Sequence, residues 1–285
     1  MSDKPTIDIT LDGAPRTIEA GTTGTLLLQD AVKKDGVVAM RVNGEPWDLD
    51  RRLPAGAVVE PIALSSEDGL NILRHSATHV LAQAVQDVFP DVNLGIGPFI
   101  TDGFYYDFGA IDAVTPEMLR EIEKRMKRIV KEGQRFVRRD ITEAEGREEL
   151  ADQPYKLELI TTKGAGAEGA SVEVGAGGLT MYDNVRRDGS VAWTDLCRGP
   201  HLPSTRLIGQ GFALTKSSSA YWKGDQSGDS LQRIYGTAWA SKDDLKAYQT
   251  RLAEAAKRDH RKLGAELDLY SFPEEIGPGL VVFHP

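Results

Sequence analysis

Leu73-Arg-His-Ser-Ala-Thr-His-Val-Leu-Ala-Gln-Ala-Val-Gln-Asp-Val88 is the stretch from which the organisation of this chain can be worked out. Apolar residues recur in it at positions 73, 77, 80, 81, 84 and 88, and this period predicts a helix. His75 and His79 are four residues apart, so a helix places both imidazoles on one face. The stretch therefore predicts a helix that presents two histidines to one site.

A second pair of reactive side chains lies far along the chain, in Cys197-Arg-Gly-Pro-His201. Gly199 and Pro200 interrupt any helix there, so we place Cys197 and His201 on a loop. The chain has five histidines and one cysteine, and four of those residues fall into these two short pairs. We therefore expect the two pairs to meet in space.

Three imidazoles and one thiol allow several kinds of chemistry. They form a ligand set that Zn²⁺ accepts tetrahedrally. They can also move protons or line a polar pocket. A helical histidine pair by itself is more often a packed or solvated coincidence, and only the second motif favours a shared site. The residues alone leave metal binding, proton transfer and a structural role open.

Composition limits the class of protein. The chain has 285 residues, of which 40% are hydrophobic and 27% charged, as expected for a soluble globular protein of two or more domains. One cysteine excludes an internal disulfide framework, and no apolar run is long enough to cross a bilayer. We expect a cytoplasmic protein with no membrane partner. The net charge of −9 argues against indiscriminate nucleic-acid binding, so RNA contacts would need local basic patches.

The first 64 residues predict a small β-grasp (ubiquitin-like) domain. Asp12-Gly13 and Asn43-Gly44 are hairpin-turn dipeptides between apolar runs. A short helix is expected at 26–34, and strands are expected at 7–11, 17–19, 37–42 and 57–62. A unit of this size suits binding or positioning better than catalysis.

Residues 65–240 predict a larger α+β domain. The histidine helix follows the linker 65–69 and is expected to end at Phe89-Pro90, and a second helix from Thr115 to Gly133 has an N-cap, an N1 proline and a C-terminal glycine. Gly95 and Gly97 lack the setting of a dinucleotide loop and indicate a turn. A glycine-rich segment at 163–178 is expected to be a mobile loop, and strands are expected at 103–108, 135–138, 155–160 and from 212.

The last part of the chain changes in character. Ser241 begins a highly charged helix that is expected to run to Leu263 and to stop at Gly264. Residues 265–285 are apolar but too few to bury a core, as if a further domain were cut off. Basic clusters at 124–128 and 257–262 are candidate RNA contacts, although most such runs are solvated helix faces.

Several longer strings then match one family in order. They are Gly103–Asp107, Asp195–His201, Ala220–Asp225, Leu231–Trp239 and Ala255–Gly264. With them, essentially the whole chain resembles the N-terminal part of bacterial threonyl-tRNA synthetases. The resemblance implies a TGS domain at 1–64, a tRNA-editing domain at 65–240, a linker helix at 241–264 and the truncated start of a class II catalytic domain at 265–285.

The resemblance also implies partners and cofactors. The full-length parent would attach threonine to tRNA(Thr) with ATP, Mg²⁺ and a zinc ion of its catalytic domain, and would be a homodimer through that domain. Those motifs would lie beyond Pro285, so this fragment is expected to lack aminoacylation and to need no cofactor for editing. Its expected partners are tRNA(Thr) and the serine moiety of mischarged tRNA.

Editing by this family is expected to remove serine that has been attached to tRNA(Thr) in place of threonine. Serine lacks only one methyl group of threonine, worth about 1–3 kcal/mol, so a second pocket must hydrolyse the wrong ester. The resemblance assigns catalysis to His75, His79 and Lys156, the last in a segment that matches the editing-site lysine strand. It assigns binding of the seryl group to Asp195, Cys197 and His201. On its own Lys156 would be read as a solvated lysine, and His260 and His284 are expected to be bystanders.

The resemblance leaves open whether the editing site holds a zinc ion. Related alanyl-tRNA editing domains hold a metal with a similar histidine and cysteine set, whereas the threonyl family is expected to hydrolyse without one. Three hypotheses therefore compete: a metal-independent editing hydrolase, a zinc-dependent aminoacyl-tRNA deacylase and a non-catalytic RNA-binding module. Metal content separates the second from the others, and a deacylation assay separates the third.

Overall fold

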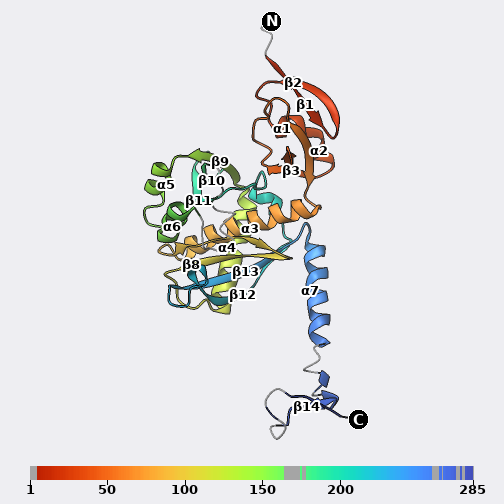
Figure 1. Cartoon of the computed structure of the whole chain (residues 1–285), viewed down its shortest axis with the longest axis vertical. Helices are drawn as coiled ribbons and strands as arrows, with labels where there is room; N and C mark the ends of the chain where they lie inside the picture. The colour runs from red at the N-terminus through yellow and green to blue at the C-terminus, as the bar shows by residue number, and fades with distance from the viewer. Residues whose placement is uncertain are drawn as a thin grey trace. The chain divides into compact units, whose positions relative to one another are not determined.

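The computed structural model describes residues 5–163, 174, 178–258, 263–264, 266–273, 277 and 280–284. The chain is an α+β protein that divides into two compact units, Met1–Ser241 and Lys242–Pro285 (Figure 1). Most of the expected loop at 163–178, and His260, lie outside the described residues. Among the described residues, no helix combines the length and the apolar character that crossing a membrane requires.

The N-terminal part of the first unit is built on one mixed sheet. Its strands, in the order β2-β1-β5-β3-β4, are β1 (Thr6–Leu11), β2 (Ala14–Glu19), β3 (Val37–Val42), β4 (Glu45–Trp47) and β5 (Val58–Ala63). Strands β1 and β5 are parallel. Asp12, Gly13, Asn43 and Gly44 all have positive φ, so both expected hairpin turns are confirmed.

Two details of this part differ from the sequence prediction. The single helix expected at 26–34 is two short helices, α1 (Gly24–Leu27) and α2 (Gln29–Lys34), because Leu28 leaves the helical conformation with ψ of 16°. Strand β4 was not predicted, since three residues containing a proline carry no alternating pattern.

A second sheet and two long helices form the largest core. The sheet has the order β12-β13-β8-β6, with β7 paired to β8. Helices α3 (Glu67–Val88) and α4 (Pro116–Glu132) pack against each other and against this sheet (Figure 1). The strands are β6 (Asn93–Leu94), β7 (Phe99–Ile100), β8 (Gly103–Gly109), β12 (Phe212–Tyr221) and β13 (Ser230–Ala238).

The ends of both helices follow from their sequences. The Ser66 hydroxyl accepts from the Gly69 amide at 3.1 Å, so α3 begins at Glu67, inside the expected linker 65–69. It ends at Val88, which confirms the predicted end of this helix. Helix α4 has Thr115 as its N-cap, a proline at its start and Gly133 at φ of 69° as its C-cap, as predicted.

A third sheet, in the order β11-β10-β9, lies beside two shorter helices. Its strands are β9 (Arg135–Ile141), β10 (Leu179–Val185) and β11 (Val191–Leu196), and the helices are α5 (Glu143–Glu149) and α6 (Pro154–Thr162). Short 3₁₀ turns lie at Thr205–Ile208 and Trp222–Gly224.

The strand predicted at 155–160 is wrong, because these residues form α6. Alternation of Tyr155, Leu157 and Leu159 suggested a strand, whereas the buried residues are Tyr155, Lys156, Leu159 and Ile160, which is helical spacing. Pro154 occupies the first helical turn, where its missing N–H costs nothing. Lys156 therefore stands on a helix, and the expected lysine strand is corrected.

The second unit contains α7 (Lys242–Lys257), β14 (Tyr270–Ser271) and β15 (Val282–Phe283). The helix predicted to reach Leu263 ends at Lys257, where the Arg258 amide bonds the Ala255 carbonyl only three residues back. Of the basic cluster at 257–262, residues 259–262 lie outside the described part of the chain.

The basic cluster at 124–128 is a salt-bridged helix face. Each of its four basic side chains lies within 4 Å of a carboxylate, in the pairs Lys124–Glu121, Arg125–Asp87, Lys127–Glu123 and Arg128–Glu132. This pairing leaves little excess positive field, so the solvated-face interpretation fits the cluster better than RNA contact does.

Candidate active site

The structure brings the two sequence motifs together. His75 and His79 project from α3, and Cys197 and His201 lie on the loop that follows β11. One ligand atom from each of the four side chains lies within 4.8 Å of the others, and all four residues are buried. The expectation that the pairs meet in space is therefore confirmed.

Cys197 lies between two imidazoles. Its Sγ is 3.3 Å from His75 Nε2 and 3.2 Å from His201 Nε2. The Gly199 amide also donates to this sulfur at 3.2 Å. Gly199 has φ of 70°, and a Cβ there would collide with the Tyr182 hydroxyl, so only glycine allows the loop to turn at this point.

Ser76 determines the orientation of His201. Its hydroxyl donates to the Ile72 carbonyl at 2.8 Å and accepts from the Leu202 amide at 2.9 Å. Since the hydroxyl hydrogen is already used, the contact of 3.2 Å to His201 Nδ1 requires that nitrogen to donate. His201 Nε2 is then left with its lone pair directed at Cys197, as an acceptor or a ligand.

Aromatic rings enclose the other side of the imidazoles. The ring of Phe136 stacks on His201 at 5.0 Å, and Trp193 meets His79 edge-on at 5.2 Å. His79 Nδ1 is buried without a hydrogen-bond partner among the described residues. Such an atom is normally satisfied by a water, a ligand or an ion.

Burial holds all three imidazoles in the neutral form. It lowers the pKa of His75 from 6.5 to about 4, opposed by a hydrogen bond to the Pro200 carbonyl and assisted by the charge of Lys156. Burial also lowers the pKa of His79 and of His201 well below 6.5, and the neighbouring histidines add to the effect. Neutral imidazoles can accept hydrogen bonds from water or bind a metal.

Lys156 and Asp195 form a buried ion pair beside this cluster. The Lys156 Nζ is 2.9 Å from Asp195 Oδ1, and both side chains are 0% exposed. The Tyr106 hydroxyl donates to Asp195 Oδ2 at 2.6 Å, and the Leu196 amide donates to Oδ1 at 2.8 Å. Burial raises the pKa of Asp195, whereas Lys156 and Tyr106 lower it.

Comparison with known proteins gives the family. Residues 177–235 match the family described as "Threonyl and Alanyl tRNA synthetase second additional domain". A threonine–tRNA ligase of Cutibacterium acnes is 71% identical over 282 residues, covering 98% of this chain and 41% of the relative. Those of Micrococcus luteus and Thermobifida fusca are 59% and 58% identical, covering 100% of this chain and 43% of each relative.

By sequence, the chain belongs to the threonine–tRNA ligase family. It spans about two fifths of the length of these curated relatives, at 41% and 43%. The matched family segment includes Asp195 but begins well after α3 and α6. The other half of the candidate site, with His75, His79 and Lys156, therefore comes from the threonine–tRNA ligase sequence that precedes the matched domain.

All six sequence-predicted site residues of this threonine–tRNA ligase homologue lie in one buried region, four in the imidazole–thiol cluster and two in the ion pair. His284 belongs to the second unit, where its ring contacts Ser271 Oγ and the Asp268 carbonyl, both at 2.9 Å. Sequence reasoning missed Tyr106, Ser76, Tyr182 and Asp48, which hold the predicted residues in place. Tyr106 and Ser76 lie inside motifs that were recognised, but nothing in the sequence marks Asp48.

Proposed function

We propose that this chain hydrolyses the ester bond of tRNA(Thr) mischarged with serine. The observation that carries the proposal is the buried cluster of His75, His79, Cys197 and His201 beside the Lys156–Asp195 pair, in a chain of this family. Attachment of threonine to tRNA(Thr) would be the activity of a longer protein that contains this region, and the partner of both activities would be tRNA(Thr).

His75 and Lys156 suit the chemical step. Water attacks the ester carbonyl carbon, the bond to the tRNA 3′-oxygen breaks, and the water proton ends on that oxygen. With a pKa near 4, His75 remains neutral at pH 7 and orients the water as a hydrogen-bond acceptor rather than as a strong base. The Lys156 ammonium stabilises the negative charge that develops on the carbonyl oxygen. Asp195 already neutralises part of the positive charge of Lys156. A directed hydrogen bond from the ammonium to the carbonyl oxygen therefore matters more than the net charge of the pair.

Cys197, His201 and Asp195 suit selection of the amino acid. Cys197 is 1% exposed and lies between two imidazoles. An ester whose amino-acid side chain is larger than that of serine would therefore have to displace these imidazoles to bind beside the thiol. Rejecting the extra methyl of threonine by crowding is worth about 1–3 kcal/mol, or roughly 10–200-fold.

The test is deacylation of Ser-tRNA(Thr) and Thr-tRNA(Thr) by the purified chain under single-turnover conditions. The seryl ester should be hydrolysed faster, and His75→Asn should slow it with little change in tRNA affinity. A His284→Asn variant is the matched control, because that histidine lies in the other compact unit. Absence of deacylation by the folded chain would favour the RNA-binding alternative.

Zinc-dependent hydrolysis is the second candidate, favoured by the same cluster. Three neutral imidazoles and a thiol with ligand atoms within 4.8 Å, together with the unpartnered His79 Nδ1, fit a tetrahedral zinc ligand set. His75, His79, Cys197 and His201 would hold the ion, which would supply Lewis-acid activation of the ester. Stoichiometric metal in the purified chain, with activity lost on chelation and restored by Zn²⁺, would establish this alternative.

A further inference from the structure

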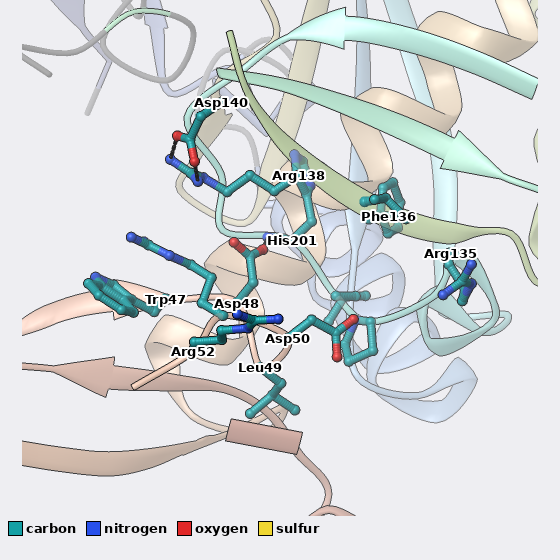
Figure 2. A pocket seen from close by; sticks show the side chains of 14 residues that line it. Trp47, Asp48, Leu49, Asp50, Arg52, Arg135, Phe136, Arg138, Asp140 and His201 are labelled. Atoms are coloured by element: carbon teal, nitrogen blue, oxygen red, sulfur yellow. Dashed lines mark hydrogen bonds and ion pairs between the residues drawn. The ribbon is translucent and has the colours of Figure 1, made fainter. Parts of the chain in front are cut away.

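Asp48, a residue of the N-terminal sheet region, reaches the loop that carries Cys197 and His201. Its Oδ1 accepts from the His201 backbone amide at 2.8 Å, and its Oδ2 accepts from the Tyr182 hydroxyl at 2.6 Å. Asp48 follows β4, whereas its two donors belong to the β10 strand and the loop after β11. Figure 2 shows its carboxylate beside His201 in a cleft of about 500 Å³.

Both contacts act on groups that shape the candidate site. The amide of His201 fixes the backbone from which that imidazole reaches Cys197 at 3.2 Å. The ring of Tyr182 packs edge-on against His201 at 4.6 Å, so the hydrogen bond to Asp48 also fixes the ring beside the imidazole. One carboxylate therefore restrains His201 from two sides.

The carboxyl of Asp48 is held by two hydrogen bonds, and the net effect of its surroundings is a raised pKa. Burial raises the pKa of this carboxyl, while its two hydrogen bonds and the charges of Arg138 and Arg51 lower it. Its two hydrogen bonds make Asp48 an anchor between the segment that follows β4 and the loop.

We propose that Asp48 is a positioning residue, through which the N-terminal part of the chain holds the Cys197–His201 loop in the arrangement that brings His201 to Cys197. The effect on hydrolysis rests on the proposed function, but the effect on the loop does not. The competing view is that Asp48 only joins two parts of the first unit and leaves the loop unchanged.

The loop can be tested without any substrate, because Cys197 is the only cysteine and is 1% exposed. We compare the rate at which 5,5′-dithiobis(2-nitrobenzoate) modifies Cys197 in native chains of wild type, Asp48→Ala, Asp48→Asn and Asp50→Asn. Asp50 is the matched control, since it lines the same cleft but accepts from Thr25 at 2.7 Å instead of from the loop. Circular dichroism and urea unfolding verify that each variant is folded.

Asp48→Ala should raise the modification rate on the order of tenfold, as expected for loss of two hydrogen bonds. Asp48→Asn keeps an oxygen acceptor for the His201 amide and should restore most of the protection, and Asp50→Asn should match wild type. Modification of the Ala variant no faster than of Asp50→Asn, or an Asn variant as reactive as the Ala variant, would overturn the proposal.

Single-turnover hydrolysis of Ser-tRNA(Thr) is the second readout. Asp48→Ala should lower the rate constant about tenfold at an unchanged half-saturating tRNA concentration, with rescue by Asp48→Asn. An unchanged rate constant in the Ala variant would contradict a role in the site. If wild type itself fails to hydrolyse the ester, the proposed function is lost, while the thiol measurement still decides whether Asp48 holds the loop.

Discussion

At the residue scale, the meeting of the two motifs could be predicted, but their supports could not. His75, His79, Cys197 and His201 are rare residue types in tight spacing, so the sequence itself marks them. Asp48 is one of many aspartates, and its bonds to Tyr182 and His201 join positions 134 and 153 residues apart. Contacts of that separation leave no periodic trace in a single sequence.

The Lys156–Asp195 pair gives a stability prediction. Lys156→Met removes a cation from a pair that is 0% exposed, so an unpaired carboxylate is left buried. We expect a loss of about 3–5 kcal/mol in the free energy of unfolding by urea. The double variant Lys156→Met/Asp195→Asn should recover much of that loss. A single variant as stable as wild type would mean that Asp195 is not buried in its charged form.

Cys197 gives a selectivity prediction. Cys197→Ala opens space beside the seryl group, so the ratio of seryl to threonyl hydrolysis should fall several-fold, within the roughly 10–200-fold that a methylene-sized difference is worth. Cys197→Ser preserves the size and serves as control. Zinc content is measured on the same samples. A joint loss of metal and activity in the Ala variant would identify the thiol as a ligand instead.

The buried histidines give a pH prediction. Because the folded-state pKa of His75 is about 4 and the unfolded value is 6.5, the unfolded chain binds more protons between these values. The free energy of unfolding is therefore at its full value above about pH 6.5 and falls as pH falls toward 4. His75 alone accounts for about 3 kcal/mol of this fall. Urea unfolding of chelator-treated chain across this range measures the slope. His75→Asn should flatten it, and equal slopes in both chains would contradict burial of a neutral His75.

At the scale of elements, helices with complete end signals were predictable. Helix α4 combines a threonine N-cap, a proline in its first turn and a left-handed glycine at its end, and each signal acts within a few residues. Helix α6 was mistaken for a strand because alternation and helical spacing coincide over so short a run. Local signals succeed where the element is long enough to repeat them.

The start of α3 gives a prediction at this scale. A Cβ at Gly69 would collide with the Ala63 carbonyl, and two backbone segments cannot easily move apart. Gly69→Ala should therefore destabilise the chain by about 1–3 kcal/mol in spite of the better helix propensity of alanine. Gly178→Ala is the control, because a Cβ there meets nothing within 4 Å. Equal unfolding midpoints for the two variants would show that α3 can shift.

At the scale of the whole molecule, the candidate site is assembled from distant parts of one compact unit. Helix α3 supplies two imidazoles, α6 supplies the lysine, and β11 with its following loop supplies the carboxylate, the thiol and the third imidazole. The segment that follows β4 adds Asp48 from outside these elements. The α+β class could be predicted from the order of elements, whereas this convergence depends on packing that only the folded structure reveals.

Editing of mischarged tRNA is tested by the ratio of single-turnover deacylation rates of this chain on Ser-tRNA(Thr) and Thr-tRNA(Thr). The seryl ester should be hydrolysed at least roughly tenfold faster, the lower end of what one methyl group can provide. Equal rates on the two esters would contradict it.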